Sequence, residues 1–279
     1  MTIRKQAAAP SNQDDLRSAR RALALEADGI ARLADALDER FGAALDLIAP
    51  VTGRVVVTGM GKSGHIARKI ASTLSSVGTP SLYVHPGEAS HGDLGMITDR
   101  DAVIALSNSG ETPELSDLTA YTRRFSIPLI AITSKAGSTL SDTADVALVL
   151  PASPEACPLG LAPMTSTTMM LALGDAIAVA LLERKGFTTD DFQVLHPGGK
   201  LGRMLLRVAD IMHDREELPL IGAETGVSEA ILIMTAKHFG CVGVTGPDGR
   251  LIGIITDGDL RRHMPGDLLA HKAAEIMTA

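Results

Sequence analysis

A strand that runs into a glycine-rich turn constrains this chain more than any other stretch. The β-branched run Val55-Val56-Val57-Thr58 predicts a buried strand, and a Gly-Met-Gly-Lys-Ser-Gly turn at 59–64 precedes a helix predicted over 65–73. The free N–H groups of such a turn and the positive end of the helix point at one spot, which suits an anion. Lys62 adds a full positive charge there.

This turn has three interpretations. Its letters match G-x-G-x-x-G, a dinucleotide-binding pattern that is weak by itself. The phosphate-binding Walker A motif is excluded, because Val56 stands where its first glycine should be. A lysine inside the turn, followed by Ser63, favours a compact phosphate monoester over a pyrophosphate. The third interpretation is a tight strand–helix turn that holds no ligand.

A second turn, rich in hydroxyl groups, follows a later strand. Further short strands are predicted at 79–84, 102–106, 128–133 and 146–150, and helical stretches between them indicate a parallel α/β sheet. The second of these strands runs into Ser107, Ser109 and Thr112, with Thr112 as a predicted N-cap and Pro113 as first helical residue. Ligands bind at the carboxyl ends of parallel strands, so both turns are predicted to serve one site.

Composition narrows the class of partner. A net charge of −7 and 3% aromatic residues, with no tryptophan, argue against nucleic-acid and anionic-membrane partners. Cys157 and Cys241 fit no metal spacing, which favours a reducing compartment. The N-terminus has no apolar signal region, and the apolar stretch 169–182 is too short to span a membrane. We therefore expect a soluble, cytoplasmic protein.

The N-terminal region differs from the α/β core. Residues 1–13 are predicted to be a disordered tail, and residues 14–48 predict a long amphipathic helix, with Gly29 and Gly42 as candidate bends. Two partners are open for its apolar face: another subunit or the chain's own domain.

Two loop residues are candidates for acid–base chemistry. Glu155 lies in a proline-rich loop at 151–168, ahead of a helix predicted over 166–185, and His196 lies in a Gly/Pro-rich segment. Packing explains neither residue, which favours a chemical role. The alternative for His196 is a hydrogen bond that orders its loop. Glu114 stands near a predicted helix start, where interaction with the helix dipole is the alternative.

The loop after the second strand carries groups that bind metals. His85, Glu88, His91 and Asp93 lie close together in sequence, but their spacing is not H-E-x-x-H. Polar lining for a hydroxylated ligand is the favoured interpretation, with an incidental transition ion on His85.

A second, smaller α+β unit follows. Residues 209–213, Ala-Asp-Ile-Met-His, recur as Ala-Glu-Ile-Met-Thr at 274–278, and a helix and two strands are predicted between the copies. The pattern indicates an internal repeat whose second copy is cut off after its opening.

Five segments, in order, carry a family resemblance: VTGMGKSGHIARKI, VHPGEASHGDLGM, SNSGET, EACPLGLAP with TSTT, and LHPGGKLG. Over about residues 15–279 the chain resembles the arabinose-5-phosphate isomerases, in which a sugar isomerase (SIS) domain precedes two CBS repeats. The resemblance implies a three-layer α/β/α sandwich with a mostly parallel five-stranded sheet at 14–206. It also implies a smaller α+β CBS domain at 207–270, with 271–279 opening a truncated second repeat.

The resemblance implies an activity and its setting. The family interconverts D-ribulose 5-phosphate and D-arabinose 5-phosphate through an enediol, the first step toward Kdo for lipopolysaccharide, and is usually tetrameric. No cofactor is implied, and zinc on His85 would be incidental or inhibitory. A CBS pair encloses a nucleotide-like regulator, of which one copy forms half the cleft. The alternative function is a non-catalytic sugar-phosphate sensor, although such sensors usually carry a DNA-binding unit and no basic N-terminal unit is seen here.

The resemblance also assigns residues. Its catalytic positions match Lys62, Glu114, Glu155 and His196. Its phosphate-cradling positions match Ser63, Ser107, Ser109 and Thr112, and its substrate-lining positions match Gly78, Thr79, His85 and His91. By analogy, Glu155 shuttles the proton, His196 opens the ring or moves oxygen protons, from its own or a neighbouring subunit, Lys62 stabilises the enediolate or the phosphate, and Glu114 orients His196 or Lys62.

Overall fold

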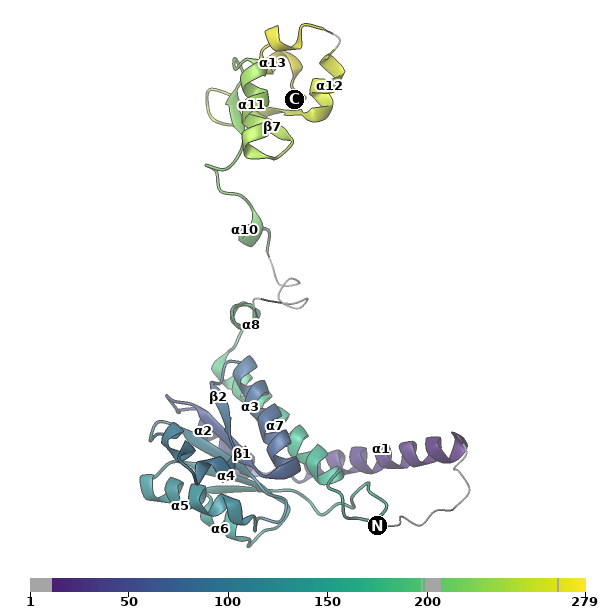
Figure 1. Cartoon of the computed structure of the whole chain (residues 1–279), viewed down its shortest axis with the longest axis vertical. Coiled ribbons are helices and arrows are strands. Elements are labelled where there is room, and N and C mark those ends of the chain that lie inside the picture. The colour runs from purple at the N-terminus through teal and green to yellow at the C-terminus, as the bar shows by residue number, and fades with distance from the viewer. Residues whose placement is uncertain (1–11, 197, 199–206, 265) are drawn as a thin grey trace. The chain divides into compact units, whose positions relative to one another are not determined.

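A computed structural model describes residues 12–196, 198, 207–264 and 266–279, in two compact units, 1–205 and 206–279 (Figure 1). Most of the predicted tail, residues 1–11, lies outside the described residues. Asn12 and Gln13, which were also assigned to that tail, belong instead to the first helix.

A five-stranded sheet of order β2-β1-β3-β4-β5 forms the centre of the first unit, and all neighbouring strands are parallel. The strands are β1 (Val55–Gly59), β2 (Ser81–Val84), β3 (Ala102–Leu106), β4 (Leu129–Thr133) and β5 (Val146–Val149). Thr58 lies beside Val84, and Gly59 beside Leu106, so the carboxyl ends meet at one edge. We call this the carboxyl edge and the opposite one the amino edge.

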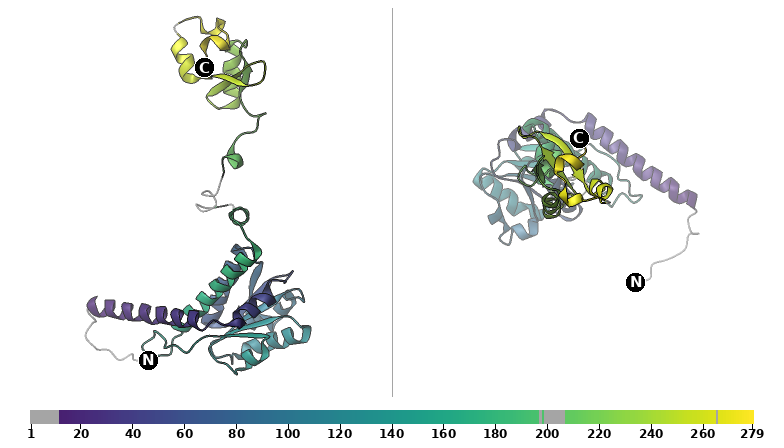
Figure 2. Two further views of the ribbon diagram at one scale, coloured as in Figure 1. Left: turned by 180° about the vertical axis from the view of Figure 1, so that it is seen from behind. Right: turned by 90° about the horizontal axis from the view of Figure 1, so that it is seen from above.

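Helices cover both faces of this sheet, as Figures 1 and 2 show. The helices of this unit are α1 (Asn12–Asp35), α2 (Glu39–Ile48), α3 (Gly61–Ser76), α4 (Pro86–Ala89), α5 (Ser116–Phe125), α6 (Thr139–Thr143), α7 (Thr165–Lys185) and α8 (Thr189–Leu195), with short 3-10 turns η1 (Asp93–Met96) and η2 (Pro113–Leu115); α8 packs on neither face. Because side chains alternate along a strand, Val55 and Val57 pack with α1, α2, α3 and α7, whereas Val56 packs with α4, α5 and α6. The predicted three-layer α/β/α fold is confirmed, and its sheet is entirely parallel.

The apolar helix α7 is an interior element of the first unit. It is the one described helix long and apolar enough to cross a membrane, but half of its apolar window is buried in the fold. Gly174 lets α3 approach closely, since a Cβ there would lie 2.3 Å from Ile70. Lys69 and Asp175 form an ion pair across the same two helices. The apolar composition of α7 therefore serves packing.

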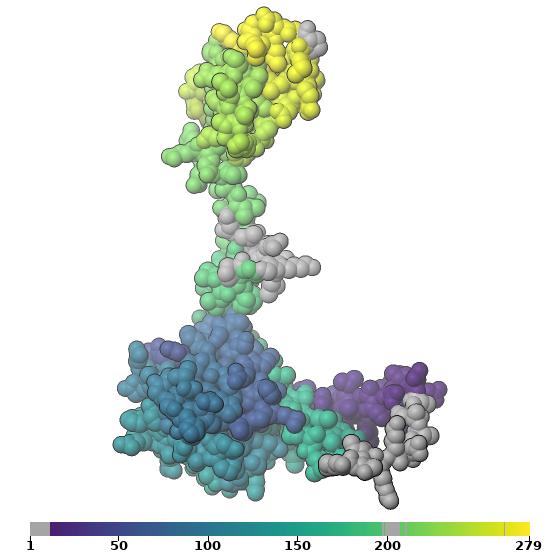
Figure 3. Space-filling view, in the orientation of Figure 1, coloured from purple at the N-terminus to yellow at the C-terminus, as the bar shows by residue number. Residues whose placement is uncertain are grey.

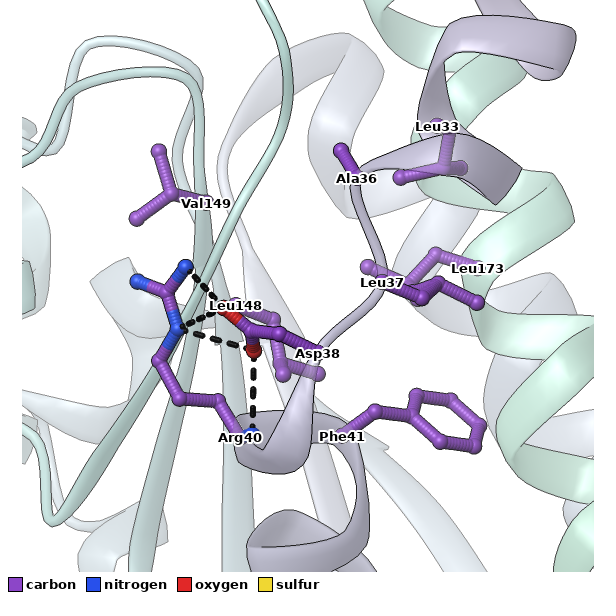
Figure 4. Close-up of a pocket in the computed structure, with 9 residues that line it drawn as sticks. All are labelled: Leu33, Ala36, Leu37, Asp38, Arg40, Phe41, Leu148, Val149 and Leu173. Atoms are coloured by element: carbon purple, nitrogen blue, oxygen red, sulfur yellow. Dashed lines mark hydrogen bonds and ion pairs between the residues drawn. The ribbon is translucent and has the colours of Figure 1, made fainter.

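The predicted helix over 14–48 is two helices, and the break lies at residues 36–38 rather than at Gly29 or Gly42. Asp38 takes an extended conformation, and its carboxylate accepts from Arg40 N at 3.0 Å, which caps α2 (Figure 4). Gly29 instead allows a close contact with α7, because a Cβ there would lie 2.7 Å from Thr165.

The second unit contains a three-stranded sheet of order β6-β7-β8, with β6–β7 parallel and β7–β8 antiparallel. Its elements are α10 (Val208–Ile211), β6 (Leu220–Gly222), α11 (Val227–Lys237), β7 (Cys241–Thr245), β8 (Leu251–Thr256), α12 (Asp257–His263), η3 (Leu268–Ala270) and α13 (Ala273–Ile276). The two copies of the repeated segment differ in environment: Ile276 is buried and Thr278 bridges to Ile254, whereas Ile211 is exposed. The unit has the α+β character that was predicted.

Candidate functional site

The turn after β1 presents a lysine and free N–H groups at the carboxyl edge. The helix begins at Gly61, four residues earlier than predicted, so Lys62 and Ser63 lie in the first turn of α3. Gly61 has a φ of +57°, a left-handed conformation that favours glycine. The N–H groups of a first turn have no carbonyl of their own helix to bond. The Lys62 side chain is exposed and has no partner within the described ranges, so this turn can accept an anion.

Tyr83 stabilises the backbone of this turn. Its hydroxyl donates to Gly59 O at 2.9 Å, and the Arg68 guanidinium lies 4.1 Å from the centre of its ring. Burial raises the pKa of the Tyr83 phenol, so the hydroxyl stays a donor at neutral pH. Gly64 completes the contact, because a Cβ there would lie 2.5 Å from Gly59 O.

The turn after β3 forms a closed set of hydroxyl contacts. The hydroxyls of Ser107 and Thr112 share a hydrogen bond of 2.7 Å, and Gly110 N donates to Ser107 Oγ at 3.0 Å. Ser109 is exposed and accepts from Glu111 N. Thr112 occupies the predicted N-cap position before η2, but its side chain bonds Ser107 and makes no cap bond.

Glu111 fastens this turn to the start of α6. Its carboxylate accepts from Thr139 N at 2.9 Å and from the Thr139 hydroxyl at 2.6 Å. These bonds, the hydroxyl's first, lower the pKa of Glu111. Glu114 is exposed in η2, on the same segment.

The His85 segment is partly helical rather than an irregular loop. His85 caps α4, with Nδ1 accepting from Gly87 N at 3.2 Å, and its ring meets Tyr83 edge-on. His91 follows α4 and is exposed. In the part of the chain that the structure describes, no three His, Cys, Asp or Glu residues group as metal ligands. The incidental zinc ion on His85 stays a prediction.

The proline-rich loop after β5 brings Glu155 to the start of α7. Glu155 Oε2 accepts from Met164 N at 2.6 Å, and Ala156 N donates to the Thr165 hydroxyl at 3.0 Å, which closes the loop at its base. Backbone N–H groups, that of Ala162 first, lower the pKa of the Cys157 thiol in this loop.

Helices α3 and α7 run in the same direction, which places their first turns at the same edge. Ile70 packs on Gly174 in mid-helix, and Gly78, just after α3, meets Phe187, just after α7. The first turn of α3, which contains Lys62, therefore lies at the carboxyl edge. The start of α7, to which Glu155 is bonded through Met164 N, lies there too. The structure thus brings the following predicted residues to this edge: Lys62, Ser63, His85, His91, Ser107, Ser109, Thr112, Glu114 and Glu155.

Three predicted site residues do not lie at the carboxyl edge. Gly78 and Thr79 precede β2 at the amino edge, where Lys185 Nζ donates to Thr79 Oγ1 at 2.9 Å and to Gly78 O at 3.3 Å. A cavity of about 630 Å³ beside them is also lined by residues of α8. His196 follows α8, stacks on Phe192 and donates through Nδ1 to Phe192 O at 2.9 Å, a bond of the kind its alternative interpretation expected. The rest of its LHPGGKLG segment lies mostly outside the described residues.

Sequence reasoning did not single out Tyr83, the anchoring role of Glu111, or Ser166 in the first turn of α7. A tyrosine in a strand resembles any core residue, so no local signal marks Tyr83. Ser166 lies in the TSTT motif that carried part of the resemblance, but the motif did not distinguish Ser166 from its neighbours.

Two family models match this chain, one in each of its two units. A model of the SIS domain matches residues 48–180, and a model of the CBS domain matches residues 208–266. Arabinose 5-phosphate isomerase KdsD of Salmonella typhi is 49% identical over 259 residues, covering 92% of this chain and 79% of that protein. The chain belongs to the arabinose 5-phosphate isomerase family. The resemblance predicted from its motifs is thereby confirmed.

Two further proteins agree with this placement. KdsD of Pseudomonas aeruginosa is 51% identical over 252 residues, covering 90% of this chain and 77% of that isomerase. An Escherichia coli CFT073 protein, solved in complex with arabinose 5-phosphate, is 40% identical with a TM-score of 0.65, and the match covers 67% of this chain and 100% of that one.

Proposed function

We propose that this chain interconverts D-arabinose 5-phosphate and D-ribulose 5-phosphate. The observation that carries the proposal is that the Lys62 turn, the hydroxyl-rich turn and the Glu155 carboxylate all lie at one edge of the sheet. The identity to KdsD relatives and the likeness to a protein solved with arabinose 5-phosphate support the choice of sugar.

The phosphate end of the substrate suits the two turns. The first turn of α3 offers backbone N–H groups, the Ser63 hydroxyl and the Lys62 charge, and the turn after β3 adds the hydroxyls of Ser107, Ser109 and Thr112. The Glu111 carboxylate lies beside the proposed cradle, but its negative charge accepts hydrogen bonds from the N–H and the hydroxyl of Thr139.

The reacting end suits Glu155. In the aldose, the Glu155 carboxylate takes the proton from C2, the electron pair forms the C1–C2 double bond, and the carbonyl electrons move to O1. A proton moves from O2 to O1, and Glu155 returns its proton to C1, which leaves the ketone at C2. Met164 N occupies one oxygen of Glu155, Oε2, so Oε1 is the oxygen for the proton. His196 and Lys62 would serve the oxygen protons and the charge, and Glu114 would orient one of them.

This reaction needs no cofactor, because it transfers only protons. Zinc at His85 would be incidental or inhibitory, and it would cost the bond from Gly87 N, because an imidazole whose Nδ1 accepts carries its proton on Nε2.

The proposal includes a homotetramer. Leu16, Leu23 and Ile30 recur every seven residues along one face of α1, and each is at least 40% exposed. The start of α1, purple in Figure 3, projects from the body of the first unit. A face of this kind suits a neighbouring subunit. Such a neighbour would also bring its own His196 to the carboxyl edge.

The proposal also places the enzyme in the cytoplasm, at the first step toward Kdo for lipopolysaccharide, with a nucleotide-like regulator at the CBS unit. The CBS match and the isomerase relatives support this setting.

The test is turnover of D-arabinose 5-phosphate by the purified chain, with and without EDTA. Activity that persists or rises in EDTA is expected. Activity that is lost in EDTA and restored by a metal ion would overturn the metal-free reaction. Binding of the sugar phosphate without turnover would favour the non-catalytic sensor.

A further inference from the structure

Thr165, the first residue of α7, is fully buried and uses both branches of its side chain. Its hydroxyl oxygen accepts from Ala156 N at 3.0 Å, and Ala156 is itself buried. Its methyl group faces α1, since a Cβ on Gly29 would lie 2.7 Å from Thr165 Cγ2. One side chain therefore joins α1 to the loop that carries Glu155.

Glu155 is held by two hydrogen bonds, both to residues at the start of α7. Its carboxylate accepts from Met164 N at 2.6 Å, and the peptide group that follows its Cα donates, through Ala156 N, to Thr165. The first bond fixes the end of the side chain, and the second fixes the backbone from which the side chain extends. A change in either bond would move Glu155 Oε1, the oxygen proposed to take the proton.

The contact with α1 determines where the Thr165 hydroxyl points. Threonine in a helix is divided between two χ1 rotamers, so its hydroxyl has no single preferred direction. A glycine inside a helix is less favourable than alanine, so Gly29 needs a packing reason, and it leaves room for the Thr165 methyl group. Leu33, one turn further along α1, is buried and lines a pocket with Leu173 of α7, so the helices stay packed beyond this point (Figure 4). A methyl group held against Gly29 leaves the hydroxyl for Ala156 N.

We infer that Thr165, held against Gly29 of α1, is a positioning residue for the proposed base Glu155. The inference rests on the proposed function. Thr165 touches no substrate atom, because it is buried, and it acts through Ala156 N on the place of the Glu155 carboxylate. Proton transfer from C2 requires that carboxylate at a set distance and direction, and a misplacement of about 1 Å can cost about 10²-fold in rate. Helix α1 thereby supports the base without contributing a group to the reaction.

Two substitutions separate the hydroxyl of Thr165 from its methyl group. Thr165→Val keeps the shape and removes the acceptor for Ala156 N, so kcat should fall about 10–10²-fold with KM within about threefold of wild type. Thr165→Ser keeps the acceptor, so its kcat should stay within about threefold of wild type. Wild-type kcat in Thr165→Val, or an equal loss of kcat in both variants, would overturn the inference.

A second background shows whether Thr165 acts through Glu155. The base is already absent in Glu155→Gln, so adding Thr165→Val there should leave the residual kcat within about twofold. A residue whose role is only structural would lower kcat by the same factor in both backgrounds. Equal factors would therefore overturn the inference, even with a large loss of kcat in Thr165→Val alone.

The contact with α1 has its own test, which does not depend on the folding of Thr165→Val. Gly29→Ala places a methyl group against Thr165 Cγ2 and should lower kcat about tenfold. Thr165→Ser removes that Cγ2, so the double variant of Gly29→Ala with Thr165→Ser should regain most of the kcat. A kcat of Gly29→Ala within about twofold of wild type, or a double variant no faster than Gly29→Ala, would overturn the inference.

Gly42→Ala is the matched control for the glycine series. It also changes a glycine inside a helix, but nothing lies within 4 Å of a Cβ at that position. It should therefore raise the thermal midpoint and leave kcat in place. Wild type without isomerase activity would overturn the proposed function together with this inference, whereas active wild type with an unaffected Thr165→Val would overturn the inference alone.

Discussion

The two edges of the central sheet use polar groups in opposite ways. At the amino edge, Asp101 accepts from Arg54 N at 2.6 Å and Thr98 N at 2.7 Å, and Asp145 accepts from Leu129 N at 2.8 Å. At the carboxyl edge, the Lys62 ammonium and the Ser166 hydroxyl have no partner among the described residues. The amino edge therefore uses its polar groups for stability, and the carboxyl edge leaves some of its polar groups unpaired.

The contrast teaches how a site can be recognised without a bound molecule. The two edges already differ in backbone chemistry, because helices begin at the carboxyl edge with free N–H groups, and the side chains add to that difference. Groups that are bonded within the fold should affect stability when removed. Groups that are left unpaired should affect catalysis or binding. Substitutions at the two edges test this division.

Glu155→Gln should lower kcat about 10²–10⁴-fold, because the proposed base loses its charge while keeping its shape. KM should move less. Steady-state kinetics with D-arabinose 5-phosphate measure both values, and circular dichroism checks the fold. Wild-type kcat in this variant would remove Glu155 from its role.

Asp101→Ala should destabilise the first unit by about 2–4 kcal/mol, because it leaves the backbone N–H groups of Arg54 and Thr98 without their acceptor. Chemical denaturation measures the change. At temperatures where the variant stays folded, kcat should match wild type. A fall in kcat without loss of stability would contradict the division between the edges.

Ser107→Ala should raise KM for D-arabinose 5-phosphate about tenfold, since it removes a proposed phosphate contact and its bond to Thr112. Turnover of D-arabinose, which has no phosphate, should not change. An unaltered KM would exclude Ser107 from the phosphate cradle.

Glu111→Gln should have the smallest effect, visible in the pH dependence of stability. Thr139 lowers the folded-state pKa of Glu111, so the stabilisation is complete above the unfolded pKa, near 4.5, and is lost as pH falls through the lower folded value. The thermal midpoints of wild type and variant should therefore differ at pH 7 and converge in acid.

Asp191→Asn offers a matched control for that experiment. Asp191 accepts from the N–H and the hydroxyl of Thr188, and these bonds lower its pKa in the same way. It should show the same convergence in acid without any change in KM. The Glu111–Thr139 pair lies beside the proposed phosphate cradle, and the Asp191–Thr188 pair does not. A KM change in the Asp191 variant but not in the Glu111 variant would contradict this assignment.

Much of the fold was predictable because its signals are local. β-branched runs, Gly and Pro mark strands and turns within a few residues, and the strand β3 was predicted with its observed bounds. The helix break was missed, because the glycines suggested bends, whereas Asp38 decided the break by capping α2. The helix start at Gly61 was also missed. Gly61 has a left-handed backbone conformation, and the residue pattern does not show which conformation a glycine adopts.

The sequence by itself determined the parallel α/β class, the positions of the turns after β1 and β3 and the membership of a family, since these depend on short patterns and their order. The tertiary structure decided which of the assigned residues meet: it brings Lys62 and Glu155 to one edge and leaves Gly78, Thr79 and His196 away from it. It also decided that Ser166 is buried without a partner among the described residues while Thr165 and Thr167 are bonded. The physical reason is that burial and hydrogen-bond partners are set by segments distant in the chain, which no local pattern encodes.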